Sequence, residues 1–271
     1  LGDWLWPGAQ GVNGDTRETL FFNNCYWVCN LQTAANIARA VARNDLAEQY
    51  DARASAVRLA IHKEFWVPSE DSYVNGSQAY LAIALVAGVP PDELRHVIWD
   101  RLDNEIRVKR QGHFWGGITG GSFIVRCLLD EGRPDLLCLM ASKEDYPGWI
   151  HMLRNGATTL WEDWEGKLSL CHSSYLHIGT WFVEGLAGIR PGANGDGYKN
   201  FVIRPGVWPG TALEWVDCKH ISPYGAITSQ WRRRPNGDLE ITVGVPPNTQ
   251  AELLLPAATP AGVTESGREL A

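Results

Sequence analysis

The chain has 271 residues, 45% of them hydrophobic and 20% charged, so it can build a sizeable core and is not disordered. Its formal net charge of −7 argues against a partner nucleic acid or an anionic membrane surface, because both attract basic patches. Thirteen tryptophans exceed what a core alone usually needs, and we expect some of them to line a groove.

The six cysteines do not form a Cys-x-x-Cys pair. Cys25 and Cys29 would share one helix face, but no neighbouring histidine or cysteine completes a zinc-binding set, so we expect neither a metal nor a cofactor. Unpaired thiols favour a reducing, cytosolic setting over the periplasm. No apolar run has the length of a membrane span, and the first residues do not resemble a signal peptide.

Helical periodicity dominates the first two thirds of the chain. Apolar residues such as Ala34, Ile37, Ala38 and Val41 recur at the spacing of a buried helix stripe. The pattern predicts helices over residues 16–43, 46–65, 78–87, 92–109, 122–131, 134–143, 150–155 and 174–186. The segment 78–87 is apolar nearly all round, which indicates a helix buried on most sides.

Long, aromatic-rich loops alternate with short turns between these helices. The long loops are residues 1–15, 66–76, 111–121 and 156–172. Helical hairpins that stack in this way form an (α/α) barrel with every long loop at one mouth. We therefore predict a partial (α/α)6 barrel of about seven helices, with the four loops converging at its mouth.

The pattern changes at Ile189-Arg-Pro-Gly, where turn-forming residues begin a linker. Short alternating runs follow, and Asn236-Gly237 between two of them is a strong hairpin signal. We predict a helical domain over 1–189 and an antiparallel β-sandwich over 190–271. The sandwich has five or six visible strands, fewer than the usual seven or so, and is therefore expected to be incomplete.

The segment 156–172 concentrates the polar chemistry. Glu162, Asp163 and Glu165 alternate with the indoles of Trp161 and Trp164, and His172 follows. Indoles stack on the apolar faces of a sugar ring, and a carboxylate beside them can activate water or attack an anomeric carbon. An ordinary helix–loop junction with solvated acids explains the same residues, so the segment alone leaves both interpretations open.

Two other loops carry candidate ligand-binding side chains. Asp3, Trp4 and Trp6 place one carboxylate and two rings in the first turn, either as a plug under the first helix or as one wall of a pocket. His113 and Trp115 lie in the glycine-rich loop 111–121. Residues in both loops are candidates for substrate binding.

Several blocks resemble the bacterial α-L-rhamnosidases of glycoside hydrolase family 78. These blocks, in the order of that family, are Gly2-Asp-Trp-Leu, Gly112-His-Phe-Trp-Gly-Gly-Ile-Thr-Gly, Asp145-Tyr-Pro-Gly-Trp and Gly156-Ala-Thr-Thr-Leu-Trp-Glu-Asp-Trp with the later Ser-Leu-Cys-His. The resemblance implies an (α/α)6 barrel and hydrolysis of terminal α-L-rhamnose with inversion.

The resemblance also implies roles for single residues. Glu162 matches the family's general base and His172 a sugar-binding histidine, while Trp4 falls where an indole contacts the sugar and Asp3 lies beside it. Trp6, His113, Trp115 and Trp164 are assigned to substrate binding by their loops. For Glu162 the alternative is a capping or salt-bridged acid, and for His172 a buried structural histidine.

One departure from the family concerns the general acid. The family's Asp-Cys-Pro-x-Arg-Glu block has no match here, and Asp15-Thr-Arg-Glu18 has the position of a helix cap instead. We therefore expect a barrel without its N-terminal half, whose apolar helix faces are covered by a second copy or a partner chain. The alternatives are a non-catalytic carbohydrate-binding fragment, or another (α/α)-barrel glycosidase or lyase.

Overall fold

The computed structural model describes residues 2–9, 16–192, 197–256 and 262–269. Residue contacts divide the chain into a helical unit, Leu1–His177, and a mainly β unit, Ile178–Ala271, which we describe separately. Residues 10–15 of the predicted first loop and residues 193–196 of the predicted linker lie outside the described residues. Within the described ranges, no helix combines the length and the apolar character needed to span a bilayer.

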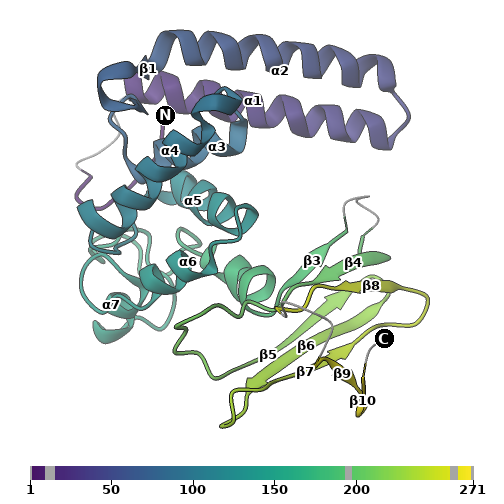
Figure 1. The fold of residues 1–271 in the computed structure, drawn as a ribbon. Helices are drawn as coiled ribbons and strands as arrows, with labels where there is room; N and C mark the ends of the chain where they lie inside the picture. The colour runs from purple at the N-terminus through teal and green to yellow at the C-terminus, as the bar shows by residue number, and fades with distance from the viewer. Residues whose placement is uncertain (1, 10–15, 193–196, 257–261, 270–271) are drawn as a thin grey trace. The chain divides into compact units, whose positions relative to one another are not determined.

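The helical unit is a series of helical hairpins (Figure 1). Its helices are α1 (Arg17–Ala40), α2 (Asn44–Phe65), α3 (Gln78–Ala87), α4 (Asp92–Asn104), α5 (Ile118–Asp130), α6 (Pro134–Ala141) and α7 (Trp149–Arg154). Short turns join α1 to α2, α3 to α4 and α5 to α6, whereas longer segments join one hairpin to the next. This alternation confirms the predicted barrel-like arrangement of hairpins.

Helix α1 begins at a cap and packs through aromatic side chains. The Thr16 hydroxyl accepts a hydrogen bond from the Thr19 N–H at 3.1 Å, which satisfies one of the free donors of the first turn. The Phe21 ring is fully buried and stacks on Tyr73 at 5.3 Å between ring centroids. Tyr73 belongs to a small ribbon of β1 (Trp66–Val67), η1 (Pro68–Glu70) and β2 (Ser72–Tyr73), where the sequence analysis expected only a loop.

Helix α3 is buried as predicted. Nine of its ten residues have little or no exposed surface, because α1 packs on one side and α4 and α5 pack on others. An all-apolar helix of this kind is stable only when it is surrounded by neighbours. Helix α3 therefore holds together the hairpins that carry the predicted loops.

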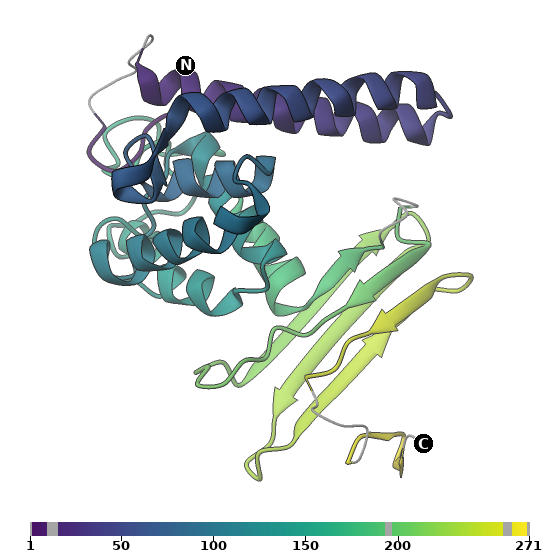
Figure 2. The same ribbon diagram turned by 45° about the horizontal axis from the view of Figure 1, so that its top comes forward.

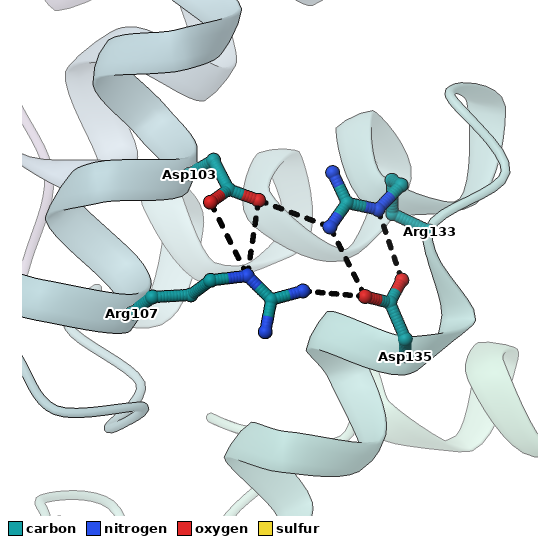
Figure 3. A network of polar contacts seen from close by, with 4 residues as sticks. All are labelled: Asp103, Arg107, Arg133 and Asp135. Carbon is teal, nitrogen blue, oxygen red and sulfur yellow. Dashed lines mark hydrogen bonds and ion pairs between the residues drawn. The ribbon is translucent and has the colours of Figure 1, made fainter. Parts of the chain in front are cut away.

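An ion-pair network joins α4 and its π-helical continuation η2 (Glu105–Lys109) to the start of α6. Figure 3 shows Asp103 and Arg107 facing Arg133 and Asp135. Arg107 Nη2 lies 2.6 Å from Asp135 Oδ2, and Arg133 Nη2 lies 3.0 Å from Asp103 Oδ1. Burial would raise the pKa of Asp135, but the hydrogen bonds and charges of Arg133 and Arg107 together outweigh burial and lower that pKa.

The last predicted helix is shorter than expected and belongs to the β unit. The sequence predicted a helix over 174–186, but α8 (Ile178–Thr180) starts later and continues as the π-helical η3 (Trp181–Leu186). The Trp231 indole N–H donates to the Leu186 carbonyl at 2.9 Å, and the Ser229 hydroxyl donates to the Ala187 carbonyl at 2.7 Å. These bonds fix the segment to the strand that carries Ser229 and Trp231.

The described residues of the β unit form two three-stranded sheets (Figures 1 and 2). The strands are β3 (Ile189–Pro191), β4 (Asn200–Ile203), β5 (Trp215–Ser222), β6 (Gly225–Arg233), β7 (Leu239–Gly244) and β8 (Gln250–Leu253), with a short terminal ribbon of β9 (Thr264–Glu265) and β10 (Arg268–Glu269). Sheet β5-β6-β7 is antiparallel, and Asn236-Gly237 lies in the β6–β7 turn as predicted. In the other sheet β4 pairs with β8 in parallel, so the expectation of a wholly antiparallel sandwich was wrong at that pair.

The core of the β unit lies between these sheets. Ile189, Phe201, Ile203 and Ile227 are buried there, and Val216 packs against them. Alternate residues of β5, β6 and β7 therefore point away from this core.

Candidate active site

The first loop is attached to the start of α5 through Asp3. Asp3 Oδ2 accepts from the Gly117 N–H and Oδ1 from the Gly120 N–H, each at 2.7 Å, and the Ile118 N–H donates to the Trp4 carbonyl at 2.7 Å. A side chain at Gly117 would collide with the Trp4 carbonyl, so the close approach requires glycine. Burial raises the pKa of Asp3, and its backbone donors oppose that rise.

This attachment explains why α5 begins earlier than predicted. The sequence analysis assigned 111–121 to a loop and started the helix at residue 122, because glycines are unfavourable inside helices. The carboxylate of Asp3 satisfies free N–H groups of the first turn and complements the helix dipole, so the helix begins at Ile118. Asp3, predicted to bind substrate, is 5% exposed and has a clear structural function.

A cavity of about 380 Å³ lies beside this attachment. Its wall combines residues of the first loop, of the segment before and at the start of α3, of the end of η2 and of the segment between η2 and α5. The lining residues are Asp3, Trp6, Pro7, Asn75, Ser77, Ala79, Tyr80, Lys109, Arg110 and Trp115. Three predicted site residues, Asp3, Trp6 and Trp115, therefore meet at one concave surface.

The Trp115 ring is held in a fixed position at this cavity. The Arg110 guanidinium lies 3.7 Å from its centroid, and Arg110 Nε bonds Glu105 Oε1 at 3.1 Å. Glu105 is almost completely buried and also pairs with Lys109. The Trp115 backbone N–H donates to Gln78 Oε1 at 3.0 Å, so both the ring and the main chain are constrained.

The segment 156–172 folds back on itself like a hairpin. The Glu162 N–H donates to the Ser169 carbonyl at 2.9 Å, and the His172 N–H donates to the Leu160 carbonyl at 2.8 Å. This pairing brings Glu162 and His172 onto adjacent stretches of backbone. The turn between them is closed by Asp163, which accepts from the backbone N–H groups after it.

The three carboxylates of this segment have different surroundings. Asp163 is 5% exposed and is occupied by the turn. Glu165 accepts from the Tyr146 hydroxyl and from the Gly8 N–H. Glu162 Oε2 accepts from the Ser169 N–H at 3.2 Å, while its Oε1 has no hydrogen-bond partner in the part of the chain that the structure describes. Both donors to Glu165 bind its Oε1, so within the described residues Glu162 and Glu165 each keep a second oxygen for a ligand or a water, whereas Asp163 keeps none. Glu162 is distinguished by its place opposite Ser169, on the stretch of backbone adjacent to His172.

The indoles of this segment do not form a cup around Glu162. Trp164 is fully buried, stacks on Tyr175 at 3.9 Å and donates from Nε1 to the Gly116 carbonyl at 3.2 Å. Trp161 is 7% exposed and lies against Gly166, where a Cβ would approach its ring to 2.7 Å. The assignment of Trp164 to substrate binding was therefore wrong: its ring belongs to the core, and Trp6 and Trp115 supply the indoles of the cavity.

The remaining predicted site residues differ in availability. His113 faces the Arg110 carbonyl at 2.9 Å from Nδ1 and Asp145 Oδ1 at 2.8 Å from Nε2, so both ring nitrogens are already engaged. His172 is exposed, and its Nδ1 bonds the Ser174 hydroxyl at 2.7 Å. Trp4 is half-buried and fixed through its backbone. His172 is thus the more accessible histidine.

The four predicted loops converge within the described residues. Asp3 links the first loop to 111–121, Gly8 links it to Glu165 in 156–172, and Asn75 lines the same cavity as Asp3. Sequence reasoning missed Arg110, Tyr80 and Gln78 at this site. Only Gln78 carried a signal, as a lone polar residue at the start of an otherwise apolar helix.

Comparisons with known proteins cover nearly the whole chain. The family model described as bacterial alpha-L-rhamnosidase 6 hairpin glycosidase domain matches residues 1–186, and that of the bacterial alpha-L-rhamnosidase C-terminal domain matches residues 188–269. A curated alpha-L-rhamnosidase of Streptomyces avermitilis is 28% identical over 96% of this chain and 25% of its own length. One of Alteromonas sp. (strain LOR) is 28% identical over 95% of this chain and 29% of its own length.

Solved structures show the same relation. The chain is similar to the Streptomyces avermitilis alpha-L-rhamnosidase complexed with L-rhamnose, with 27% identity and a TM-score of 0.84 over 96% of this chain and 25% of that one. The Aspergillus terreus alpha-L-rhamnosidase is 25% identical, with a TM-score of 0.84. The match covers 94% of this chain and 30% of the Aspergillus chain. The chain thus spans between a quarter and a third of the length of these relatives.

Proposed function

Because the chain belongs to the bacterial alpha-L-rhamnosidase family, we propose that it forms part of a glycoside hydrolase that removes terminal α-L-rhamnose from glycosides or polysaccharides. We further propose that the reaction inverts the anomeric carbon and that Glu162 is its general base. The support for this role is that a backbone N–H orients the Glu162 carboxylate, on the stretch of backbone adjacent to His172, while its Oε1 has no partner among the described residues.

The environment of Glu162 suits a base. A backbone N–H holds one oxygen and fixes the orientation of the carboxylate, while the other oxygen remains available to a water molecule. Removal of a proton from that water as it attacks the anomeric carbon gives a product of inverted configuration. His172, on the adjacent stretch of backbone, is proposed to hydrogen-bond the sugar, and Trp6 and Trp115 to pack on its apolar face.

An inverting glycosidase needs a second carboxyl to protonate the leaving oxygen. Of the neighbouring acids, Asp163 is engaged in the turn and Asp3 in the start of α5, while Glu165 is bound through Oε1 to Tyr146 and Gly8. The sequence also has no match to the family block that carries the acid. We therefore propose that the general acid is supplied from outside these 271 residues.

The outer surface of the first hairpin supports the proposal that part of the active domain lies outside these 271 residues. Leu20, Trp27, Ile37 and Leu59 on α1 and α2 are 52%, 40%, 60% and 71% exposed. An apolar groove of about 490 Å³ runs between the two helices. Monomeric soluble proteins seldom leave such surfaces uncovered. We propose that further hairpins of the six-hairpin domain, from the same polypeptide or another chain, cover it.

Hydrolysis of an aryl α-L-rhamnoside tests the proposal, because an activated leaving group needs little help from an acid. Glu162→Gln should lower turnover by on the order of 10²- to 10⁴-fold while the protein stays folded. Glu165→Gln is the matched control, since Glu165 is bound to Tyr146, and it should keep turnover within a few-fold of the parent. Proton NMR should show the β-anomer of rhamnose as the first product.

The opposite outcomes distinguish the alternatives. Equal losses in the two variants would remove the special role of Glu162. A retained α-configuration would exclude the inverting mechanism. Rhamnose binding without turnover, even when the chain is supplied with the missing hairpins of a relative, would identify a carbohydrate-binding fragment. If the chain turns over another glycoside, or cleaves a uronate by elimination, and does not hydrolyse rhamnosides, it is a different (α/α)-barrel enzyme.

A further inference from the structure

The outward face of sheet β5-β6-β7 carries a groove of about 290 Å³. Six outward side chains form two rows across the three strands. The register pairs Trp215 with Arg232 and Arg232 with Glu240 in one row, and Asp217 with Gln230 and Gln230 with Thr242 in the other. The rows are about 7 Å apart along the strands, and each spans about 10 Å across them.

Trp215 provides an aromatic surface at one corner of this grid. Its side chain is 56% exposed. Trp231, on the adjacent strand, shows the buried arrangement, because its ring is 2% exposed and its indole N–H bonds the Leu186 carbonyl. An indole with an open face beside polar side chains can stack on the C–H face of a pyranose.

The other side chains provide hydrogen-bonding groups of both kinds. Gln230 Nε2 donates to Asp217 Oδ1 at 2.9 Å, which orients the amide and leaves its carbonyl oxygen free to accept. Arg232 offers donors and Glu240 offers acceptors in the row with Trp215. Paired donors and acceptors beside a flat ring match the alternating hydroxyls of a sugar.

The charge of the groove selects among sugars. Asp217 and Glu240 are acidic and Arg232 is basic, and Arg234 at the border of the groove pairs with Glu240 at 2.5 Å, so the groove with its border carries no net charge. A neutral saccharide needs no counter-charge here, whereas a polyuronate would need an excess of basic side chains that the groove lacks. We propose that this face of the β unit is a carbohydrate-binding surface for neutral oligosaccharides, separate from the cavity at Trp6 and Trp115.

Affinity electrophoresis of the folded chain tests this proposal, with a neutral rhamnan in one native gel and polygalacturonate in another. The rhamnan should retard the parent chain, and the polygalacturonate should not. Trp215→Ala should weaken the apparent binding of rhamnan by at least about tenfold, and Trp215→Tyr should restore part of it. Gln230→Ala should also weaken binding without altering the ring.

Trp27→Ala is the matched control, because it removes an exposed indole of the helical unit that lines neither the groove nor the cavity. It should retain most of the retardation. Circular dichroism should show that all variants are folded.

Three results would overturn the proposal: rhamnan does not retard the parent chain, Trp215→Ala binds as well as the parent, or polygalacturonate retards the chain more strongly than rhamnan. The result is independent of turnover, because Glu162→Gln should bind rhamnan through the sheet as the parent does. If the sheet does not bind rhamnan, the assignment of Glu162 as general base is unaffected. If Glu162 is not the general base, the proposal for the sheet is unaffected.

Discussion

Replacement of Asp3 by asparagine should destabilise the helical unit. The two oxygens of Asp3 accept from Gly117 and Gly120 at 2.7 Å, and Oδ1 also accepts from Trp4 at 2.9 Å. The asparagine side chain has the same shape but offers only one acceptor oxygen, so its NH₂ group faces a backbone donor. At least one charge-assisted bond is lost, and a buried N–H is left without a partner.

The cost is estimated from these contacts. Loss of a hydrogen bond to a charged group is worth roughly 1.5–3 kcal/mol, and the interaction of the charge with the helix N-terminus adds roughly 0.3–1 kcal/mol. Burial already penalises the charged form, as the raised pKa of Asp3 indicates, so removal of the charge returns part of this energy. We expect a net loss of about 2 kcal/mol, which corresponds to a fall in Tm of about 4–8 °C for a unit of this size.

Thermal unfolding followed by far-ultraviolet circular dichroism measures this change. Asp100→Asn, at an exposed position on α4, is the matched control and should leave Tm unchanged within about 1 °C. If Asp3→Asn and Asp100→Asn melt together, the attachment of the first loop to α5 does not contribute stability. If Asp3→Asn has the Tm of the parent but loses rhamnose binding, Asp3 binds substrate instead of stabilising the helical unit.

Two further predictions concern the aromatic core next to the site. Burial lowers the pKa of His177 from its ordinary value of 6.5 to about 4. The unfolded chain therefore binds this proton at a higher pH than the folded chain does. As the pH drops from 6.5 to 4, the free energy of unfolding should fall by up to about 3 kcal/mol. His177→Phe should remove that component in urea titrations across this range, and parallel pH profiles would contradict the reasoning. Trp164→Ala should cost about 3–5 kcal/mol of stability, because its ring is fully buried. Trp115→Ala should raise KM for an aryl rhamnoside with little change in Tm. If the two variants show the reverse effects, Trp164 and not Trp115 is the indole that contacts the substrate.

The helical hairpins and most strands followed from local patterns. The all-apolar segment 78–87 indicated a buried helix, and Asn236-Gly237 indicated a hairpin, because helix periodicity and turn chemistry are properties of neighbouring residues. The start of α5 did not follow from such patterns, since its glycine-rich first turn depends on the carboxylate of Asp3, more than a hundred residues earlier.

The sequence by itself determined that carboxylates and indoles would gather in four loops at one end of stacked hairpins. It did not determine which of them remain available to a ligand. Trp164 is buried because Tyr175 and Gly116 meet it in the fold. Among the described residues only the Ser169 N–H reaches the Glu162 carboxylate, whereas the turn occupies both oxygens of Asp163, and Tyr146 and Gly8 bind one oxygen of Glu165. Availability depends on contacts between distant segments, and only the tertiary structure decides which segments meet.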